Sequence, residues 1–161
     1  MSNKNYKELI NFADDMDSKT IKDALLKGER VILECKRAKT EVPKSIWQTY
    51  SAFANTIGGL ILLGVDENLQ EKDVSKRFQI IGVDEPSKII TDFWNTLNSV
   101  KVNENILVDS DVEVVNMDGA QIVCIHVPQA DWRAKPIVCQ SVVITLVTHK
   151  MTHVQIVHTE V

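Results

Sequence analysis

The sequence predicts an α/β (α+β) fold: a single domain with a mixed sheet, built from a βαβ unit, a further strand and helix, and an antiparallel C-terminal hairpin. The first supporting observation is an amphipathic segment, residues 46–57, which meets Gly58-Gly59 and then the apolar run 60–63. Such a run is typical of a strand covered on both faces, as parallel strands are. The second is a β-branched segment just upstream, residues 31–36, which supplies the other strand of the unit. The third is Asp118-Gly119 between two apolar runs, a strong hairpin signal.

Composition indicates a globular domain and argues against several other classes. The chain has 161 residues, of which 44% are hydrophobic and 25% charged, proportions usual for one soluble domain. Three cysteines without a close spacing argue against a disulfide framework and favour a reducing cytoplasm. We expect no membrane partner, because no apolar run approaches the roughly 20 residues of a spanning helix and the start lacks a signal peptide. The formal net charge is −4, so nucleic-acid contact requires a local basic patch.

The remaining elements follow from local patterns on either side of the βαβ unit. Residues 1–18 are interpreted as an N-terminal helical extension, and Asp17-Ser18 is the N-cap of a second helix that ends at Gly28. After the unit, the charged linker 67–79 is expected to be a surface loop. It leads to a strand at 78–83, an amphipathic helix from Pro86 to Val100, and hairpin strands at 106–115 and 120–127.

The βαβ unit is expected to bring charged residues to one edge of the sheet. In a right-handed crossover the strands 31–36 and 60–65 run parallel. Glu34, Lys36 and Asp66 then all approach the carboxyl ends of their strands. Open α/β sheets place ligand sites at this edge.

Two groups of basic residues are candidates for phosphate contact. The first comprises four cations within nine residues, next to the positive N-terminus of the helix: Lys36, Arg37, Lys39 and Lys44. The same pattern also suits a solvated loop. Arg133 and Lys135, in the loop 128–136, are expected to join this patch.

The end of the helix carries residues with expected structural roles. Asn55 and Thr56 can hydrogen-bond backbone groups where the helix ends. Gly58 and Gly59 can supply a left-handed helix stop without a Cβ penalty.

Five short motifs, in their order along the chain, resemble those of one family. They are Glu29-x4-Glu34-Cys35-Lys36, Ala52-Phe53-Ala54-Asn55-Thr56-x-Gly58-Gly59, Leu63-Gly64-Val65-Asp66-Glu67, Ile80-Ile81-Gly82-Val83 and Arg133-x-Lys135-Pro136. On these motifs, residues 19–138 resemble the Schlafen-type AlbA-like domain family. The resemblance implies nucleic-acid handling, as a DNA-binding transcriptional regulator with DNA or RNA as its partner.

For some animal members the resemblance implies RNA cleavage by an acidic trio, which in this sequence is Glu29, Glu34 and Asp66. Glu34 and Asp66 would then be metal ligands. In one extended strand, five residues separate Glu29 from Glu34 by about 16 Å and put their carboxylates on opposite faces. A metal needs its ligand oxygens within about 2.0–2.6 Å of one point. Glu29 therefore serves only if the chain bends back at Gly28. The alternative is that Glu29 is a solvated loop residue and Glu34 a partner of Lys36 or Lys44.

We expect a non-enzymatic nucleic-acid-binding module that requires no cofactor. One alternative is an endoribonuclease that uses Mg²⁺ or Mn²⁺ with the acidic trio. Another is a dimeric protein-interaction module with no nucleic-acid role. No Gly-x4-Gly-Lys-Ser/Thr motif occurs, so we expect no ATP. Animal Schlafen proteins carry two such lobes facing each other, which implies a homodimer for a chain with one.

The last part of the sequence, residues 139–161, is an atypical tail. The 25 residues from Ile137 to Val161 contain no Gly, Pro, Asn or Asp, and the resemblance ends at the same point. Two interpretations stay open for residues 140–161. They are a non-native continuation produced by a shifted reading frame, or a divergent closing strand rich in Val, Thr and Ile.

Overall fold

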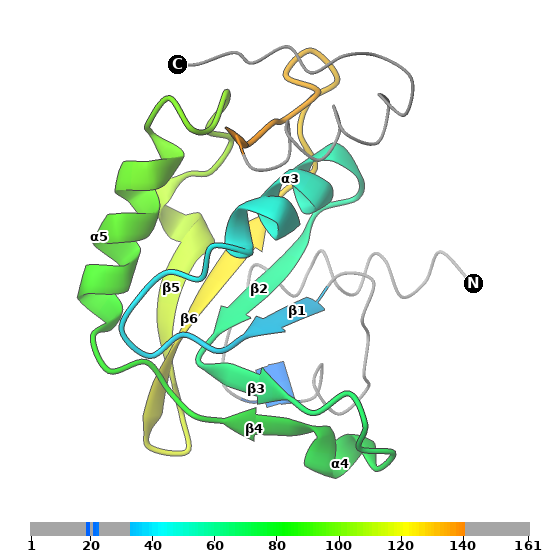
Figure 1. The fold of residues 1–161 in the computed structure, drawn as a ribbon, viewed down its shortest axis with the longest axis vertical. Helices are drawn as coiled ribbons and strands as arrows, with labels where there is room; N and C mark the ends of the chain where they lie inside the picture. Colours follow the sequence, from blue (N-terminus) through cyan, green and yellow to red (C-terminus); the bar gives the residue numbers. More distant parts are fainter. Residues whose placement is uncertain (1–18, 20, 23–32, 141–161) are drawn as a thin grey trace, which may run out of the picture.

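The computed structural model describes residues 19, 21, 22 and 33–140. Its elements, drawn in Figure 1, alternate between strands and helices before a final hairpin. They are β1 (Leu33–Lys36), α3 (Ile46–Asn55), β2 (Gly59–Leu63), β3 (Val65–Glu67), α4 (Val74–Arg77), β4 (Phe78–Ile80), α5 (Pro86–Leu97), the 3₁₀ turn η2 (Asp109–Asp111), β5 (Val112–Met117) and β6 (Ala120–Val127).

The predicted fold class is confirmed. Four strands form one mixed sheet in the order β1-β2-β6-β5, in which β1 and β2 are parallel and the other neighbours antiparallel. The helix α3 connects the parallel pair, so the βαβ unit is present as expected. Asp118 and Gly119 form the turn of the β5–β6 hairpin with φ of 53° and 83°, the left-handed values that a two-residue turn of this kind requires.

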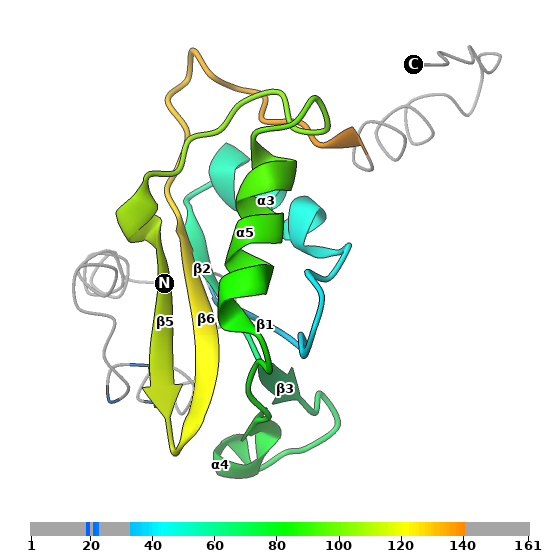
Figure 2. The same cartoon turned by 90° about the vertical axis from the view of Figure 1, so that its left-hand side faces the viewer.

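Strand β2 is covered on both faces of the four-stranded sheet, which explains its uninterrupted apolar sequence. Figures 1 and 2 show α3 and α5 on the same side of this sheet. On that side, Ile61 and Leu63 of β2 pack with buried residues of both helices, among them Tyr50 and Phe93. The alternate residues of β2 point to the other side and pack with Ile21, which is fully buried. Because both faces of β2 are buried, its side chains are apolar on both sides of the sheet.

The predicted strand 60–65 is interrupted at Gly64. β2 ends at Leu63, and the next three residues form β3, which pairs with β4 in a separate two-stranded sheet. Gly64 has a φ of 94°, and its carbonyl accepts hydrogen bonds from the backbone N–H groups of Ile81 and Gly82. A Cβ on Gly64 would lie 2.9 Å from the carbonyl carbon of Gly82. Asp66 consequently belongs to the second sheet, beyond the carboxyl end of β2.

Other predicted boundaries also differ from the observed ones. The linker 67–79 contains a short helix, α4, whose N-cap Asp73 accepts a hydrogen bond from the Ser75 N–H at 3.0 Å. The strand predicted at 78–83 ends at Ile80, where the chain approaches Gly64. The hairpin strand predicted from residue 106 begins only at Val112.

The termini lie partly outside the described residues. This applies to the expected N-terminal extension at residues 1–18, to residues 31 and 32 of the first strand, and to the tail from residue 141 onward. Within the described part, Ile137 and Cys139 are buried, and Cys139 forms an antiparallel bridge with Val102.

A substitution at Gly58 can test how closely the C-terminal end of α3 packs against the end of β6. Gly58 has a φ of 81°, and a Cβ would lie 2.7 Å from the carbonyl oxygen of Val127. We predict that Gly58→Ala lowers the free energy of unfolding by about 2 kcal/mol more than Gly119→Ala, measured by urea denaturation. Gly119 is the matched control, because its φ of 83° imposes the same backbone strain while a Cβ there would meet nothing within 4 Å. Equal losses for the two variants would contradict this packing.

Candidate nucleic-acid interface

Lys36 at the carboxyl end of β1 is enclosed rather than free. It is in register with Leu63 of β2, so its side chain lies on the same face of the sheet as α3. Its ammonium group donates to Glu34 Oε1 at 3.3 Å and to the Ser45 hydroxyl at 3.2 Å. Only 10% of the side chain is exposed. The ammonium of Lys36 therefore compensates a carboxylate and ties β1 to the start of α3.

The acidic residues of the suggested trio are engaged with cations where they are described. Glu34 pairs with Lys36, and Asp66 Oδ1 lies 3.6 Å from Arg37 Nε. Glu29 lies outside the described residues. Within residues 33–140 and the short N-terminal part described, no three His, Cys, Asp or Glu side chains gather closely enough to hold a metal ion. A metal bound by Glu34 and Asp66 would compete with both ion pairs.

The loop between β1 and α3 carries exposed cations on a fixed backbone. Arg37, Lys39 and Lys44 are exposed there. The carbonyl of Lys39 accepts a hydrogen bond from the Asp84 N–H at 2.9 Å, and that of Thr40 accepts one from Lys88 Nζ at 3.2 Å. The loop is thus attached to the segment that begins α5.

A surface groove of about 520 Å³ lies between the start of α3 and α5. We call it the lysine groove, because its lining includes Lys44, Lys88 and Lys101. Lys88 lies 3.9 Å from Asp92 Oδ2, but no carboxylate of the described residues lies within ion-pair distance of Lys44 or Lys101. Trp47 supplies an aromatic wall that stacks on Phe93 at 5.3 Å between centroids. The lining also holds the carboxylates of Glu41 and Asp92, so the three lysines leave the groove with an excess of one positive charge beside the Trp47 wall.

Sequence reasoning found Lys44 but missed Lys88 and Lys101. Lys88 lies in the first turns of α5, and Lys101 follows its C-terminus. The three lysines are distant in the sequence and meet only when α5 packs beside α3. A local charge pattern could not have shown this, although the position of Lys88 on the polar face of an amphipathic helix was a weak signal.

The Asn55 side chain fastens the end of α3 to the chain that follows β6. Asn55 Nδ2 donates to the Ile137 carbonyl and Asn55 Oδ1 accepts from the Ile137 N–H, both at 2.8 Å. The Ser51 hydroxyl donates to the same carbonyl at 2.8 Å. Thr56 acts locally, since its hydroxyl donates to the Ala52 carbonyl at 2.7 Å. The backbone hydrogen bonds expected of Asn55 and Thr56 are therefore present.

The other predicted basic pair lies at the far end of α3. Arg133 and Lys135 belong to the 128–137 loop, which Figure 1 shows beyond the C-terminal end of this helix. A hydrogen bond from the Ala130 N–H to the Ala54 carbonyl, at 2.8 Å, fixes the near side of the loop. Lys44 precedes the N-terminus of the same ten-residue helix, which is about 15 Å long. The two basic groups thus flank α3 rather than forming one cluster.

The cysteines have no features of catalytic nucleophiles. Burial raises the pKa of the Cys139 thiol to about 11. Burial and the nearby Glu113 carboxylate raise the pKa of Cys124 to about 12. Burial likewise raises the pKa of Cys35, helped by Glu67 and Glu34. Because the thiolate is the reactive form, these groups are almost wholly inert near neutral pH.

A comparison with protein families gives a match to the family described as Schlafen, AlbA_2, over residues 29–150. The chain belongs to the Schlafen AlbA_2 family. The resemblance drawn from the short motifs is thereby confirmed, and the match extends beyond residue 138. A comparison with curated proteins finds no match.

A solved structure of the same architecture agrees with membership of the Schlafen AlbA_2 family. It is the N-terminal domain of a protein related to the ATP-dependent DNA helicase RecG, from Nitrosomonas europaea. It is 26% identical, with a TM-score of 0.63, over 78% of this chain and 82% of that chain. A weaker likeness is to the DIP2311 protein from Corynebacterium diphtheriae, 18% identical with a TM-score of 0.48, over 86% of this chain and 28% of that one. No helix of the described residues is long and apolar enough to cross a membrane.

We expect the role of Asn55 in the Schlafen AlbA_2 motif to be the stabilisation of the fold. Asn55→Ala leaves the N–H of the buried Ile137 without its acceptor, so we predict a loss of about 1–3 kcal/mol in the free energy of unfolding. The 128–137 loop should also be cleaved faster by protease in this variant. Thr56→Ala, which removes one exposed bond within the helix, should cost less than about 0.5 kcal/mol. Denaturant unfolding measures both, and an unchanged Asn55→Ala protein would exclude this role.

Proposed function

We propose that this chain is a nucleic-acid-binding module with a regulatory role in transcription. The observation that carries the proposal is the convergence of Lys44, Lys88 and Lys101 on one groove of a protein whose formal net charge is −4. A concentrated patch on an otherwise acidic chain is the pattern expected of local phosphate recognition. DNA and RNA both present such phosphates.

The pairing of charges decides which cations are available to a phosphate. Lys36 and Arg37 already face carboxylates, so their charge is partly compensated within the protein. Within the described residues Lys44 and Lys101 are not compensated in this way, and a bound phosphate would supply the missing counter-charge. The N-terminus of α3, next to Lys44, has no side-chain cap, and its dipole adds partial positive charge to the same region.

The comparisons are consistent with this proposal. The family and the RecG-related N-terminal domain both carry names drawn from nucleic-acid-handling proteins. The RecG-related protein is a relative of a DNA helicase by name, and a separate binding domain suits such a protein. By extension, we propose DNA or RNA as the partner of this chain.

Binding is proposed to need neither metal nor ATP. Phosphate recognition by lysines uses charge that the protein already holds. The endoribonuclease alternative would require Mg²⁺ or Mn²⁺ at Glu34 and Asp66, and the ion pairs of these two carboxylates favour binding over cleavage. Three free cysteines, two of them buried, fit the proposed cytoplasmic location.

The lysine groove can be tested through the salt dependence of binding. For a Lys44→Ala/Lys101→Ala variant we predict weaker binding to oligonucleotides of every sequence. The slope of log K against log salt, measured between about 50 and 200 mM, should fall by about 0.7–0.9 for each phosphate that the variant no longer neutralises. Fluorescence anisotropy with labelled DNA and RNA measures both quantities.

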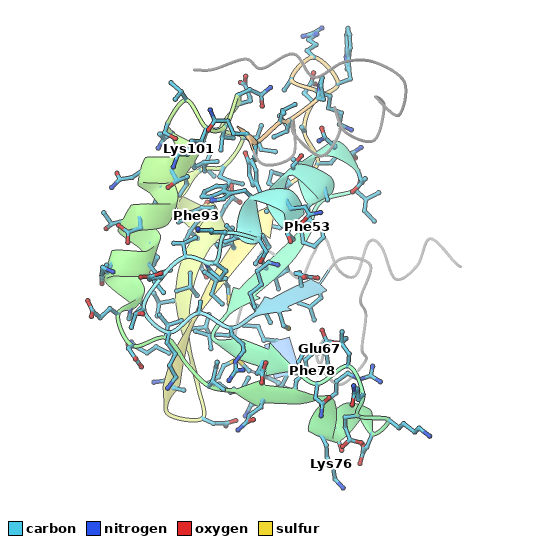
Figure 3. All side chains as sticks on the ribbon, in the orientation of Figure 1. Phe53, Glu67, Lys76, Phe78, Phe93 and Lys101 are labelled. Atoms are coloured by element: carbon cyan, nitrogen blue, oxygen red, sulfur yellow. The ribbon has the colours of Figure 1, made fainter. Side chains whose placement is uncertain are left out.

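A matched control is offered by Lys76 on α4. Figure 3 shows Lys76 and Lys101 at opposite ends of the molecule. Lys76 is exposed to 73% and lies 3.8 Å from Asp73, so Lys76→Ala removes one positive charge, as each groove substitution does, but away from the groove, and should leave the slope unchanged. Addition of EDTA should change the affinity of neither the wild-type protein nor the variants, because binding is proposed to need no metal. An equal effect of the Lys76 and groove variants would exclude the groove as the site, and no binding at low salt would favour the protein-interaction alternative.

We also propose that two copies associate. β5 is an edge of the four-stranded sheet as described, and its Val114 is 41% exposed. Edge strands offer backbone groups for pairing with another chain, and twofold association is the commonest form of soluble homo-oligomer.

We predict a dimer by light scattering at tens of micromolar protein. Val114→Lys should shift the distribution toward monomer, because a charged residue on an edge strand opposes pairing. Val100→Lys, at a still more exposed valine outside the sheet, is the control and should leave the mass unchanged. A monomer at all concentrations would contradict the association.

A further inference from the structure

Trp132 differs from the other two tryptophans in having no place in the core. Trp47 stacks on Phe93, and Trp94 meets the same ring edge-on at 5.9 Å. Trp132 is 75% exposed. Its ring has one described neighbour of note, the guanidinium of Arg133, whose carbon lies 5.4 Å from the ring centroid. Most of the Trp132 ring is therefore accessible to a ligand.

The loop that carries Trp132 is held in place on both sides. Its start is bonded to Ala54, and its end to Asn55 through the two hydrogen bonds with Ile137. Within the loop, the Asp131 carboxylate accepts from the Arg133 N–H at 2.9 Å, and the Asp131 carbonyl accepts from the Ala134 N–H at 3.0 Å. The backbone next to the ring is therefore set before any ligand arrives, which limits the entropy lost on binding.

The neighbours of the ring select the class of ligand. Arg133 is exposed and Lys135 half-buried, and neither makes an ion pair within the described residues. An aromatic ring with adjacent cations matches the chemistry of a base and its flanking phosphates. A protein hot spot is instead surrounded by further apolar contacts, whereas the neighbours of Trp132 along this loop include Asp131, Arg133 and Lys135.

We propose that Trp132 is a stacking platform for an unpaired base, and that Arg133 and Lys135 contact the adjacent phosphates. The ligand class is single-stranded nucleic acid, or an unpaired end of a duplex. Bases inside a duplex are stacked on one another and do not present a free face, so the platform distinguishes single strands from duplexes. The inference rests on the proposed function and adds a preference that the lysine groove alone does not give, because lysines contact the phosphates of both forms.

The test compares Trp132→Ala, Trp132→Phe and the wild-type protein on two probes. One is a labelled oligothymidine of about 12 nucleotides, within the site sizes of single-strand-binding domains. The other is a duplex of the same length. We expect Trp132→Ala to weaken single-strand binding about 5- to 150-fold, the loss that corresponds to one base–aromatic stack. Duplex binding should change less than about twofold, and Trp132→Phe should keep most of the single-strand affinity.

Two readouts separate stacking from a structural role. The salt slope of Trp132→Ala should equal that of the wild type, since stacking releases no counterions. The single strand should quench tryptophan fluorescence in the wild type, and this quenching should be lost in Trp132→Ala while Trp47 and Trp94 remain. Thermal unfolding should be unchanged, because 75% of Trp132 is exposed and little of it is buried in the described structure.

Several results would overturn the inference, and they differ from failure of the proposed function. Equal affinities of wild type and Trp132→Ala for the single strand would exclude stacking while leaving the groove intact. An equal loss on both probes would exclude the preference for unpaired bases. A Trp132→Ala variant that loses only self-association, by light scattering, would assign the ring to a protein contact. If the wild type binds neither probe at low salt, the proposed function fails, and this inference with it.

Discussion

The pair of hydrogen bonds between Asn55 and Ile137 is the constraint on which both proposed binding surfaces depend. A single amide side chain satisfies both backbone groups of a residue 82 positions away and thereby attaches the last described segment to the end of α3. The glycines that follow make the approach possible. A Cβ at Gly58 would meet the Val127 carbonyl, and one at Gly59 would lie 2.5 Å from the Phe53 ring. The longest of the family motifs in this chain is thus explained by packing and hydrogen bonding.

This attachment has consequences at both ends of α3. At the C-terminal end it holds the loop that presents Trp132. From Ile137 the chain continues to Cys139 and Gln140, which line the lysine groove near the start of the helix. The Gln140 N–H donates to the Lys101 carbonyl at 3.0 Å, so the segment fastened by Asn55 also positions Lys101. One constraint therefore organises two surfaces that are separated by the length of α3.

Local sequence patterns predicted the elements whose interactions are themselves local. The βαβ unit, the helix α5 and the Asp118-Gly119 turn were predicted because periodicity and turn chemistry act over a few residues. The break at Gly64 was missed because it depends on a close approach to Gly82, in another segment. For the candidate site too, the local features were predicted and the features that depend on tertiary packing were not. The clustered cations around Lys39 could be predicted, whereas the convergence of Lys88 and Lys101 on Lys44 requires the packing of α5 on α3.

The ion pair of Lys36 with Glu34 shows why residue type alone does not define a phosphate site. The sequence places Lys36 and Arg37 in a basic run, yet Glu34 and Asp66 oppose them at the carboxyl end of β1. An ion pair formed within the protein reduces the gain that a phosphate can offer, because binding must then displace a carboxylate or share its partner. A cation without an ion-pair partner therefore contributes more to binding an anion than a cation that is already paired. By this argument two of the cations at the sheet edge, Lys36 and Arg37, are compensated, and Lys39 is left there as an exposed cation without a described ion pair. The proposed site for a polyanion lies instead between α3 and α5, where two lysines have no carboxylate of the described chain as an ion-pair partner.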